Sequence, residues 1–310
     1  MKVALIQYEL YMNSYDRQHV AGEDIDAKGI KKAFLRRNDV EVCDILSINI
    51  IRDREERGEK LEYDLIIHFN HPSILFKNAI NILFFQQYYE WNSINMKDLI
   101  REYDYVITPA HKVSIDYPEV LFFPLAVDTD LYKPVSKNSN YDFDIAFIGN
   151  RRMRDIDTYN HYLLPATKYN LAIYGNGWDI EGFEKYTPFW KKILGYEEAA
   201  TLYSSIKLSI CIHSRWYTDQ FHLVTTRGFH ALSCNSLIIS DKIPVLQEML
   251  PQGIGIIYTD GYEETEKLLD KYINDNEERE HIASKGRDWV IRNHTWDIRI
   301  EQLLRQIKII

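Results

Sequence analysis

Short apolar runs, rich in β-branched and aromatic residues, alternate with longer charged and amphipathic segments along the whole chain. This alternation predicts strands that alternate with helices, and therefore parallel sheets covered by helices. In the first half, strands are expected over residues 3–8, 40–46, 64–69, 82–86, 105–108 and 120–126, with a helix over 26–37. In the second half, strands are expected over 143–149, 170–175, 208–213, 236–240 and 253–258, with helices over 197–206, 225–233 and most of the chain after Gly261.

A polar, turn-rich stretch over residues 127–142 separates the two halves of this pattern and is typical of an interdomain linker. A chain of 310 residues is long enough for two hydrophobic cores. We therefore predict an α/β protein with two Rossmann-like domains, residues 1–132 and 133–294, that face a cleft. In such sheets, ligands bind beyond the carboxyl ends of the strands.

The last segment, residues 295–310, is predicted to be a helix with one broad apolar face. Three places for this face stay open at this point. The helix can cross back to the first domain, pack on its own domain, or pair with a second copy of the chain in a homodimer.

Composition narrows the choice of partners. The chain has 37 basic and 46 acidic residues, a net charge of -9, which disfavours nucleic acid and anionic membranes and favours small molecules or glycans. Three scattered cysteines are too few for a disulfide framework and indicate a reducing compartment, so we expect a cytoplasmic protein. No apolar run is long enough for a membrane span.

Two common motifs carry little weight here. A nicotinamide-dependent enzyme needs glycines directly after the first strand, whereas the first glycine after Gln7 is Gly22. Asp128 and Asp130 match the DxD pattern that holds a metal ion against a diphosphate, but residues 24–26 and 155–157 match it too in this acidic chain. We predict neither a nicotinamide cofactor nor a metal site.

Residues suited to anion binding recur in three segments of the second half. Residues 149–154 combine a glycine with three arginines, residues 225–228 begin a predicted helix with two threonines and an arginine, and Arg215 follows the strand between them. Backbone N–H groups at a helix start, together with nearby guanidinium groups, are suited to phosphate. The alternative is that the arginines are solvated and the threonines only cap the helix. The repetition in one domain favours an anion site.

The same half resembles a known family. The segments DIAFIGNRRMR, LAIYGNGW, ILGYEEAATLYSSIKLSICIH, TTRGFHALSCNSLIISDKIPVLQEML and EEREHIASKGRDWVIRNHTW are similar to the carboxyl-terminal domain of group-one GT-B glycosyltransferases, most closely the CgeB-like, spore-maturation-type branch. The segment FFPLAVDTDLYKP resembles the interdomain crossing of that fold. The first 118 residues match only in general architecture.

The resemblance implies an enzyme of hexosyltransferase type that moves a sugar from a nucleotide-diphosphate donor, with UDP favoured, to a glycan, protein or small-molecule acceptor. It implies no cofactor beyond the nucleotide sugar and no obligatory metal, and it favours retention of configuration. Two alternatives stay open: a noncatalytic nucleotide-sugar-binding or structural protein, and a sugar-nucleotide epimerase. DNA glycosylation also occurs on this fold, but the acidic charge argues against it.

The resemblance also implies which residues meet the donor. Those expected at the diphosphate are Gly149, Asn150, Arg151, Arg154, Arg215, Thr225, Thr226 and Arg227. Those expected at the base and ribose are Gly175, Asn176, Gly177, Trp178, Leu194 and Tyr196, with Trp178 or Tyr196 stacking on the base.

One departure from the family concerns two glutamates separated by seven residues. Here His222 stands at the first position, near the sugar, and His230 at the second, at the ribose; Asn235 replaces a glycine. A carboxylate accepts from both ribose hydroxyls, whereas a neutral imidazole offers one acceptor nitrogen. The donor preference or the activity itself therefore depends on what these histidines do, and both can instead have a purely structural role.

Acceptor-side candidates lie in the first half. If the reaction inverts configuration, a base must deprotonate the acceptor, and Asp16, His19 or Glu23 after the first strand is a candidate. If it retains configuration, the leaving phosphate can take the proton. Tyr88 and Glu90, within the aromatic run 84–91, are candidates for contact with the acceptor, together with Glu23.

Overall fold

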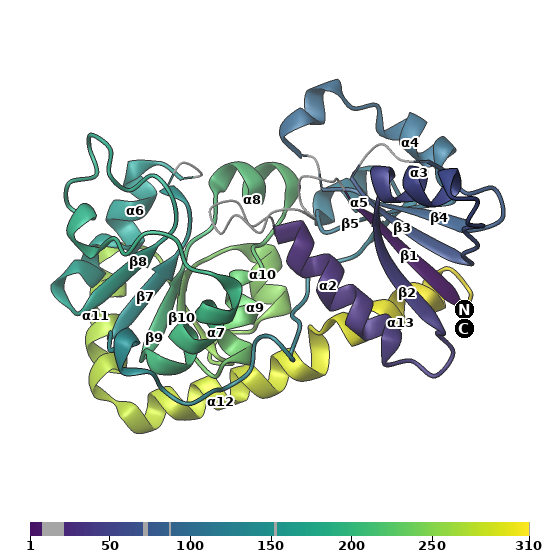
Figure 1. Ribbon diagram of the computed structural model, residues 1–310. Helices are drawn as coiled ribbons and strands as arrows, with labels where there is room; N and C mark the ends of the chain where they lie inside the picture. Colours follow the sequence, from purple (N-terminus) through teal and green to yellow (C-terminus); the bar gives the residue numbers. More distant parts are fainter. Residues whose placement is uncertain (8–21, 71–73, 87, 152–153, 310) are drawn as a thin grey trace. The chain divides into compact units, whose positions relative to one another are not determined.

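The computed structural model describes residues 1–7, 22–70, 74–86, 88–151 and 154–309. The chain forms two compact units, one of residues Met1–Ala126 with Trp296–Ile310 and one of residues Val127–Thr295 (Figure 1). Each unit contains one parallel sheet with helices packed on it. The two Rossmann-like α/β units predicted from the sequence are therefore confirmed, although the boundary falls at Ala126 instead of after residue 132.

The first unit contains a six-stranded parallel sheet with the order β2-β1-β3-β4-β5-β6. Continuous apolar runs form these strands because both faces of a parallel sheet are buried. The strands are β1 (Lys2–Gln7), β2 (Val42–Ser47), β3 (Leu65–Phe69), β4 (Ile80–Phe84), β5 (Tyr105–Thr108) and β6 (Val120–Phe122). The helices are α2 (Gly22–Leu35), α3 (Ile48–Glu56), α4 (Met96–Glu102), α5 (His111–Asp116) and α13 (Trp296–Gln306), with a 3-10 segment η1 (Tyr88–Ser93).

The last helix, α13, belongs to the core of the first unit and lies beside α2 (Figure 1). Trp296 and Ile300 on its apolar face are buried with Phe34 and Phe123. On its polar side, Asp297 accepts two hydrogen bonds of 2.6 Å from the Arg36 guanidinium. Of the three places left open by the sequence, the structure shows the return to the first unit.

The second unit contains a five-stranded parallel sheet with the order β11-β10-β9-β7-β8. Its strands are β7 (Ile145–Ile148), β8 (Leu171–Tyr174), β9 (Leu208–Cys211), β10 (Leu237–Asp241) and β11 (Ile256–Thr259). Its helices are α6 (Ile156–Tyr162), α7 (Tyr196–Ser205), α8 (Arg215–Phe221), α9 (Arg227–Ser233), α10 (Pro244–Met249), α11 (Tyr262–Asn274) and α12 (Asn276–Asn293), with 3-10 segments η2 (Ser139–Tyr141), η4 (Leu164–Lys168) and η5 (Thr187–Phe189).

The polar stretch predicted as a linker is instead part of the second unit. The backbone N–H of Val135 donates to the Ser204 hydroxyl at 3.2 Å, and that of Asn138 donates to the Ser205 hydroxyl at 3.0 Å. Hydroxyl groups on α7 thus accept hydrogen bonds from backbone N–H groups of a segment that has few apolar side chains. At the start of the unit, Val127 pairs with Thr295, where the chain enters α13.

The strand order of the second sheet defines where a ligand is expected. The chain runs from β7 outward to β8 on one side and returns to β9 on the other, so the order reverses between β7 and β9. In open parallel sheets, the crevice at such a topological switch point, outside the carboxyl ends of the strands, is the usual ligand site. The loops after β7 and β9 are the arginine-bearing loops singled out in the sequence.

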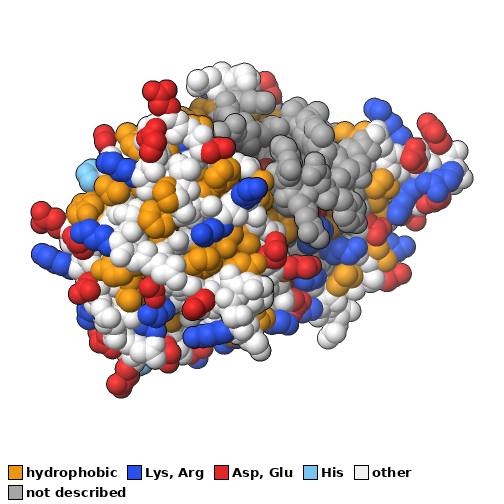
Figure 2. All heavy atoms as spheres, turned by 60° about the vertical axis from the view of Figure 1, so that its left-hand side comes forward, with side chains coloured by type: hydrophobic (Ala, Val, Ile, Leu, Met, Phe, Trp, Pro, Cys, Tyr) orange, Lys and Arg blue, Asp and Glu red, His pale blue; other side chains and the backbone are white. Residues whose placement is uncertain are grey.

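The surface and the helices agree with the charge pattern of the sequence. On the face drawn in Figure 2, basic and acidic side chains of the described residues are interspersed with apolar ones. Within the described part of the chain, every helix is too short or too polar to cross a lipid bilayer.

Candidate functional site

The loops after β7 and β8 are joined by backbone hydrogen bonds at the carboxyl edge of the second sheet. The N–H of Gly149 donates to Tyr174 O at 2.7 Å, and the N–H of Arg151 donates to Asn176 O at 3.0 Å. The Asn150 side chain accepts from the N–H of Asn176 at 2.9 Å. Four of the residues predicted at the donor, Gly149, Asn150, Arg151 and Asn176, therefore lie in one hydrogen-bonded double loop.

Gly175 is required at this crossing. Its φ of +130° lies in the region that side chains disfavour, and a Cβ there would approach the Gly149 carbonyl carbon to 2.5 Å. A Cβ on Gly149 would in turn meet the Arg227 guanidinium and the Phe147 ring. Both glycines thus allow close packing of the backbone against itself and against a guanidinium.

Two indoles hold this double loop from inside the unit. Trp178 is fully buried and donates its Nε1–H to Gly149 O at 3.0 Å. Trp190 donates its Nε1–H to Gly175 O at 2.7 Å. Trp178 also packs edge-on against Tyr159, with ring centroids 4.9 Å apart. The expectation that Trp178 stacks on a base is wrong, because its ring faces are covered by the core.

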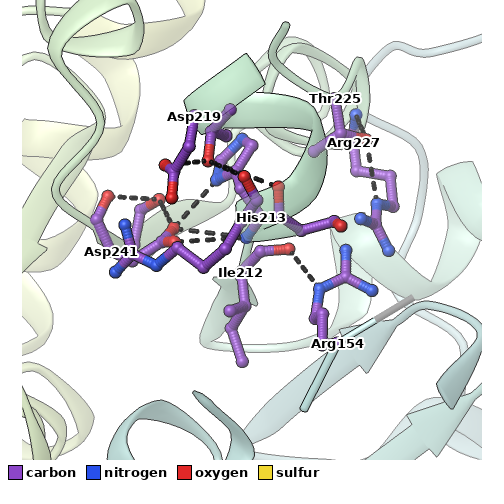
Figure 3. Close-up of polar contacts among 11 residues, drawn as sticks. Arg154, Ile212, His213, Asp219, Thr225, Arg227 and Asp241 are labelled. Atoms are coloured by element: carbon purple, nitrogen blue, oxygen red, sulfur yellow. Dashed lines mark hydrogen bonds and ion pairs between the residues drawn. The ribbon is translucent and has the colours of Figure 1, made fainter. Parts of the chain in front are cut away.

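Two arginines, which we call the arginine pair, meet at the switch point: Arg154 from the loop after β7 and Arg227 from the start of α9 (Figure 3). Arg154 Nε donates to Ile212 O, just after β9, at 2.8 Å. Arg227 donates through Nη1 to Ile148 O and through Nε to the Thr225 hydroxyl at 3.0 Å. Hydrogen bonds to carbonyl and hydroxyl oxygens orient the guanidinium groups without neutralising them.

The positive charge of the arginine pair is not balanced by a salt bridge to any carboxylate of the described residues. Burial and the charge of Arg154 lower the pKa of Arg227 to about 10, which leaves it charged at neutral pH. Both guanidinium groups also lie near the Phe147 ring, at 5.7 and 5.9 Å from its centroid. An uncompensated, partly desolvated pair of cations is a site for an anion.

Arg151 adds a third guanidinium to this region. It lies 5.2 Å from the Phe183 ring centroid, and its Nε is buried and has no hydrogen-bond partner in the described part of the chain. The three guanidinium groups all act on the pKa of Tyr159. Burial raises this pKa, and the charges of Arg154, Arg227 and Arg151 each lower it. Its hydroxyl donates to Arg151 O at 2.8 Å.

The predicted hydroxyl caps of α9 are only partly present. Thr226 occupies the N-cap position but makes no capping bond with its side chain. The hydroxyl of Thr225 instead accepts from the Arg227 backbone N–H at 3.5 Å and from Arg227 Nε. Thr225 therefore positions the arginine.

Arg215 stands apart from the other predicted arginines. It is exposed at the first position of α8, and its charge lowers the pKa of Asp155, after the Thr158 hydrogen bonds and other larger causes. Its charge also acts on Tyr162 of α6. No contact joins Arg215 to the arginine pair in the described residues.

The two histidines at the family's glutamate positions lie on different elements. His230 on α9 is buried and stacks on Tyr132, with ring centroids 3.9 Å apart and an interplanar angle of 6°. Burial, and then the charge of Arg227, lower the pKa of His230 to about 3, so it is neutral. His222 ends α8 in the left-handed conformation (φ 49°, ψ 42°), and its side chain is partly buried.

The remaining donor candidates flank the double loop. Gly177, which follows Asn176 of the double loop, is half-buried, whereas Asn176 itself is exposed. The Gly175 N–H donates to Lys192 O at 2.8 Å, which brings the segment before Leu194 beside this loop. Leu194 and Tyr196 are half-buried where α7 begins.

The acceptor-side candidates have mixed outcomes. Asp16, His19 and the Glu90 side chain lie outside the described residues. Glu23, in the first turn of α2, is partly buried, and this burial raises the pKa of its carboxyl. Tyr88 is buried and its hydroxyl bonds to Thr108 at 2.8 Å and to Phe85 O at 3.1 Å, so the expectation that it contacts an acceptor is wrong.

The structure brings together one further pair that the sequence prediction missed. His213, directly after β9, lies 2.8 Å through its Nδ1 from an Asp241 carboxylate oxygen at the end of β10, and both side chains are buried. Two polar residues at the ends of adjacent parallel strands were the available signal. Asp128, in contrast, uses its carboxylate to accept the Asp130 N–H at 2.9 Å, as in an ordinary turn.

Comparison with known proteins defines the class of the second unit. Residues 153–305, just under half of the chain, match the family described as "Glycosyl transferase-like". No curated protein sequence matches the chain. The family match identifies a glycosyltransferase-like domain and supports the prediction of an enzyme.

Solved glycosyltransferase structures are similar in fold over nearly the whole length of the chain. AviGT4, a glycosyltransferase involved in avilamycin A biosynthesis, superimposes with a TM-score of 0.68 at 14% identity, covering 99% of this chain and 97% of that one. Sucrose-phosphate synthase from Thermosynechococcus elongatus gives 0.64 at 14% identity and 99% coverage of both chains. Anabaena Alr3699/HepE, in complex with UDP and glucose, gives 0.63 at 10% identity and 99% coverage of both. The fold is therefore that of GT-B glycosyltransferases.

Proposed function

We propose that this protein is a glycosyltransferase that transfers a hexose from a UDP-sugar, without a metal ion, to a glycan, protein or small-molecule acceptor. The observation that carries the proposal is the arginine pair, Arg154 and Arg227, held uncompensated at the switch point of the second sheet. Within the GT-B fold, we propose the CgeB-like branch, because the segments quoted in the sequence analysis resemble it. UDP is favoured because a protein of the same fold, Alr3699/HepE, is described in complex with UDP.

In this proposal, the two arginines act by electrostatic stabilisation of the leaving group. When the sugar leaves, negative charge grows on the departing diphosphate, and fixed positive groups in a partly desolvated site lower the energy of that state. Ile148 O, Thr225 and Ile212 O fix the two guanidinium groups before the donor arrives, so little reorganisation is needed during the reaction. The backbone N–H groups of Gly149, Arg151 and Gly175 are used by carbonyl groups within the protein, so the charge offered to the diphosphate comes from the arginine pair.

We propose retention of configuration for the same reason. A diphosphate oxygen held by the arginine pair lies on the face from which the sugar leaves and can take the acceptor's proton. A separate base is then not required. If the reaction inverts configuration, Glu23 is the base candidate that lies within the described residues, and its carboxyl has a raised pKa.

A panel of UDP-, GDP-, ADP- and dTDP-sugars tests the proposal. Incubated with the purified protein without an acceptor, a true donor should slowly release its nucleoside diphosphate by hydrolysis. The anomer of the released sugar, followed by NMR, reports on stereochemistry. The proposal fails if no sugar nucleotide in the panel either binds or is hydrolysed.

A noncatalytic nucleotide-sugar-binding protein is the second candidate, and one observation favours it. His230 is neutral and covered by Tyr132, so it offers less hydrogen-bonding capacity than the carboxylate that the family places there. The variants His222→Glu and His230→Glu distinguish the two. Binding in the natural protein with turnover only in a glutamate variant would establish the binder.

We also propose a cytoplasmic location. Cys43, Cys211 and Cys234 are all free and buried, as suits a reducing compartment. Burial raises the pKa of Cys211 to about 11 and that of Cys234 to about 12, which keeps these thiols protonated and inert.

A further inference from the structure

The pair of His213 and Asp241, which we call the dyad, is joined by three hydrogen bonds. His213 Nδ1 lies 2.8 Å from Asp241 Oδ1, and both Asp241 carboxylate oxygens also accept from the His213 backbone N–H at 3.3 Å (Figure 3). The side chains are 2% and 0% exposed. A carboxylate only accepts hydrogen bonds, so Nδ1 must carry the hydrogen. In the neutral ring, Nε2 is then left as an acceptor with a free lone pair.

That acceptor is not used by the described part of the protein. His213 Nε2 is buried and has no hydrogen-bond partner there. A buried polar atom without a partner costs about 1–3 kcal/mol, so such atoms in native proteins usually have a function or bind a missing partner. Because the hydrogen is on Nδ1, Nε2 can only accept a hydrogen bond. The group that would bond to Nε2 must therefore be a hydrogen-bond donor.

The dyad lies at the same edge of the sheet as the arginine pair and is linked to it through Ile212. Ile212, whose carbonyl accepts from Arg154 Nε at 2.8 Å, is the residue before His213, and Figure 3 shows both contacts in one small region. Ile212 and His213 directly follow β9, which lies on one side of the switch point. A sugar attached to a diphosphate on the arginine pair would therefore lie at the edge of the sheet that carries His213.

We propose that His213, held by Asp241, is a specificity-determining residue whose Nε2 accepts a hydrogen bond from a hydroxyl group of the donor's sugar. This inference rests on the proposed function, because it needs a sugar diphosphate at the arginine pair. A hydroxyl suits the site better than a phosphate oxygen does, since a lone pair on Nε2 repels an anionic oxygen and attracts an O–H. The arginine pair already supplies the donors that a phosphate needs.

The test compares UDP with UDP-glucose by isothermal titration calorimetry. His213→Phe keeps a planar ring but removes the acceptor, and it should weaken UDP-glucose about tenfold, the worth of one hydrogen bond, with UDP unchanged within about twofold. Asp241→Asn replaces an obligate acceptor with an amide that can also donate to Nδ1, so the hydrogen is no longer fixed on Nδ1. It should also reduce the preference for UDP-glucose over UDP. His281→Phe, an exposed histidine of α12, is the control and should change neither affinity.

Deoxy analogues of UDP-glucose sharpen the assignment. For the natural protein, one deoxy analogue should bind about tenfold more weakly than UDP-glucose, and His213→Phe should add no further loss for that analogue. If His213→Phe weakens UDP and UDP-glucose equally, or neither, the inference is wrong while the proposed function stands. If His213→Phe does not fold, equal UDP-glucose preference in Asp241→Asn and the natural protein overturns it. Absence of both UDP and UDP-glucose binding by the natural protein refutes the UDP-sugar donor of the proposed function.

Discussion

Replacing Arg227 with glutamine removes one charge of the arginine pair and tests the anion site directly. The guanidinium now bonds to Ile148 O and Thr225 and lies near Arg154, with no carboxylate of the described residues to balance it. A hydrogen bond to a charged group contributes about 1.5–3 kcal/mol, so Kd for UDP should rise about 10- to 150-fold. Binding of uridine, which lacks phosphates, should change far less.

The stability of the Arg227→Gln protein should change little. Glutamine loses the two anchoring hydrogen bonds of Arg227, but its neutral side chain also removes repulsion with Arg154 and the cost of burying a charge. The free energy of unfolding, from urea titration, should therefore change by less than about 2 kcal/mol. This separates a lost ligand contact from a damaged fold.

Calorimetric titration of UDP and uridine provides the assay. Arg292→Gln, an exposed arginine on α12 of the same unit, removes the same charge away from the site and is the matched control. Its Kd for UDP should stay within about twofold, because a distant exposed charge is screened by salt. A folded Arg227→Gln protein with unchanged UDP affinity would refute the reasoning.

Three further predictions concern the fold and the loops around the site. Ile300→Ala in α13 should lower the free energy of unfolding by about 2–5 kcal/mol, because Ile300 is fully buried, whereas Ile115→Ala at an exposed position should change it by less than about 0.5 kcal/mol; urea titration measures both. Trp178→Phe should reduce stability by about 1–3 kcal/mol and weaken UDP binding, since Gly149 O loses its donor; unchanged thermal stability and affinity would contradict this. The pKa of His230 is lowered from 6.5 to about 3, so the folded protein favours the neutral ring, and the stability this gives is complete above about pH 6.5 and is lost as the pH falls toward 3. His230→Gln should therefore reduce the fall in the free energy of unfolding between pH 6.5 and 3, measured by urea titration at several pH values. An unchanged pH dependence would contradict the assignment.

The sequence predicted the sheets well because buried parallel strands are continuous apolar runs. It did not predict α8 and α10, which have seven and six residues and show little helical period. The equally short α9 was predicted because two threonines suited to a helix start precede it. The sequence prediction also placed the domain boundary too late. A polar composition at residues 127–142 does not distinguish a free linker from a segment whose backbone bonds to Ser204 and Ser205.

The candidate site was predictable in part for a related reason. Arginines and glycines directly after strands could be assigned to one edge of a sheet from order alone, and the loop of Arg154 and the start of α9 do lie there. Burial of Trp178 was not predictable, because an aromatic residue beside glycines fits both a ligand platform and a core. The dyad joins residues 28 positions apart, and only the pairing of β9 with β10 brings them together.

A crystal structure of the protein with UDP is the most direct measurement of the central claim. Its diphosphate oxygens should lie within hydrogen-bonding distance of the Arg154 and Arg227 guanidinium groups, outside the carboxyl ends of β7 and β9. UDP bound elsewhere in the chain, with both arginines free of it, would contradict the assignment of this edge as the donor site.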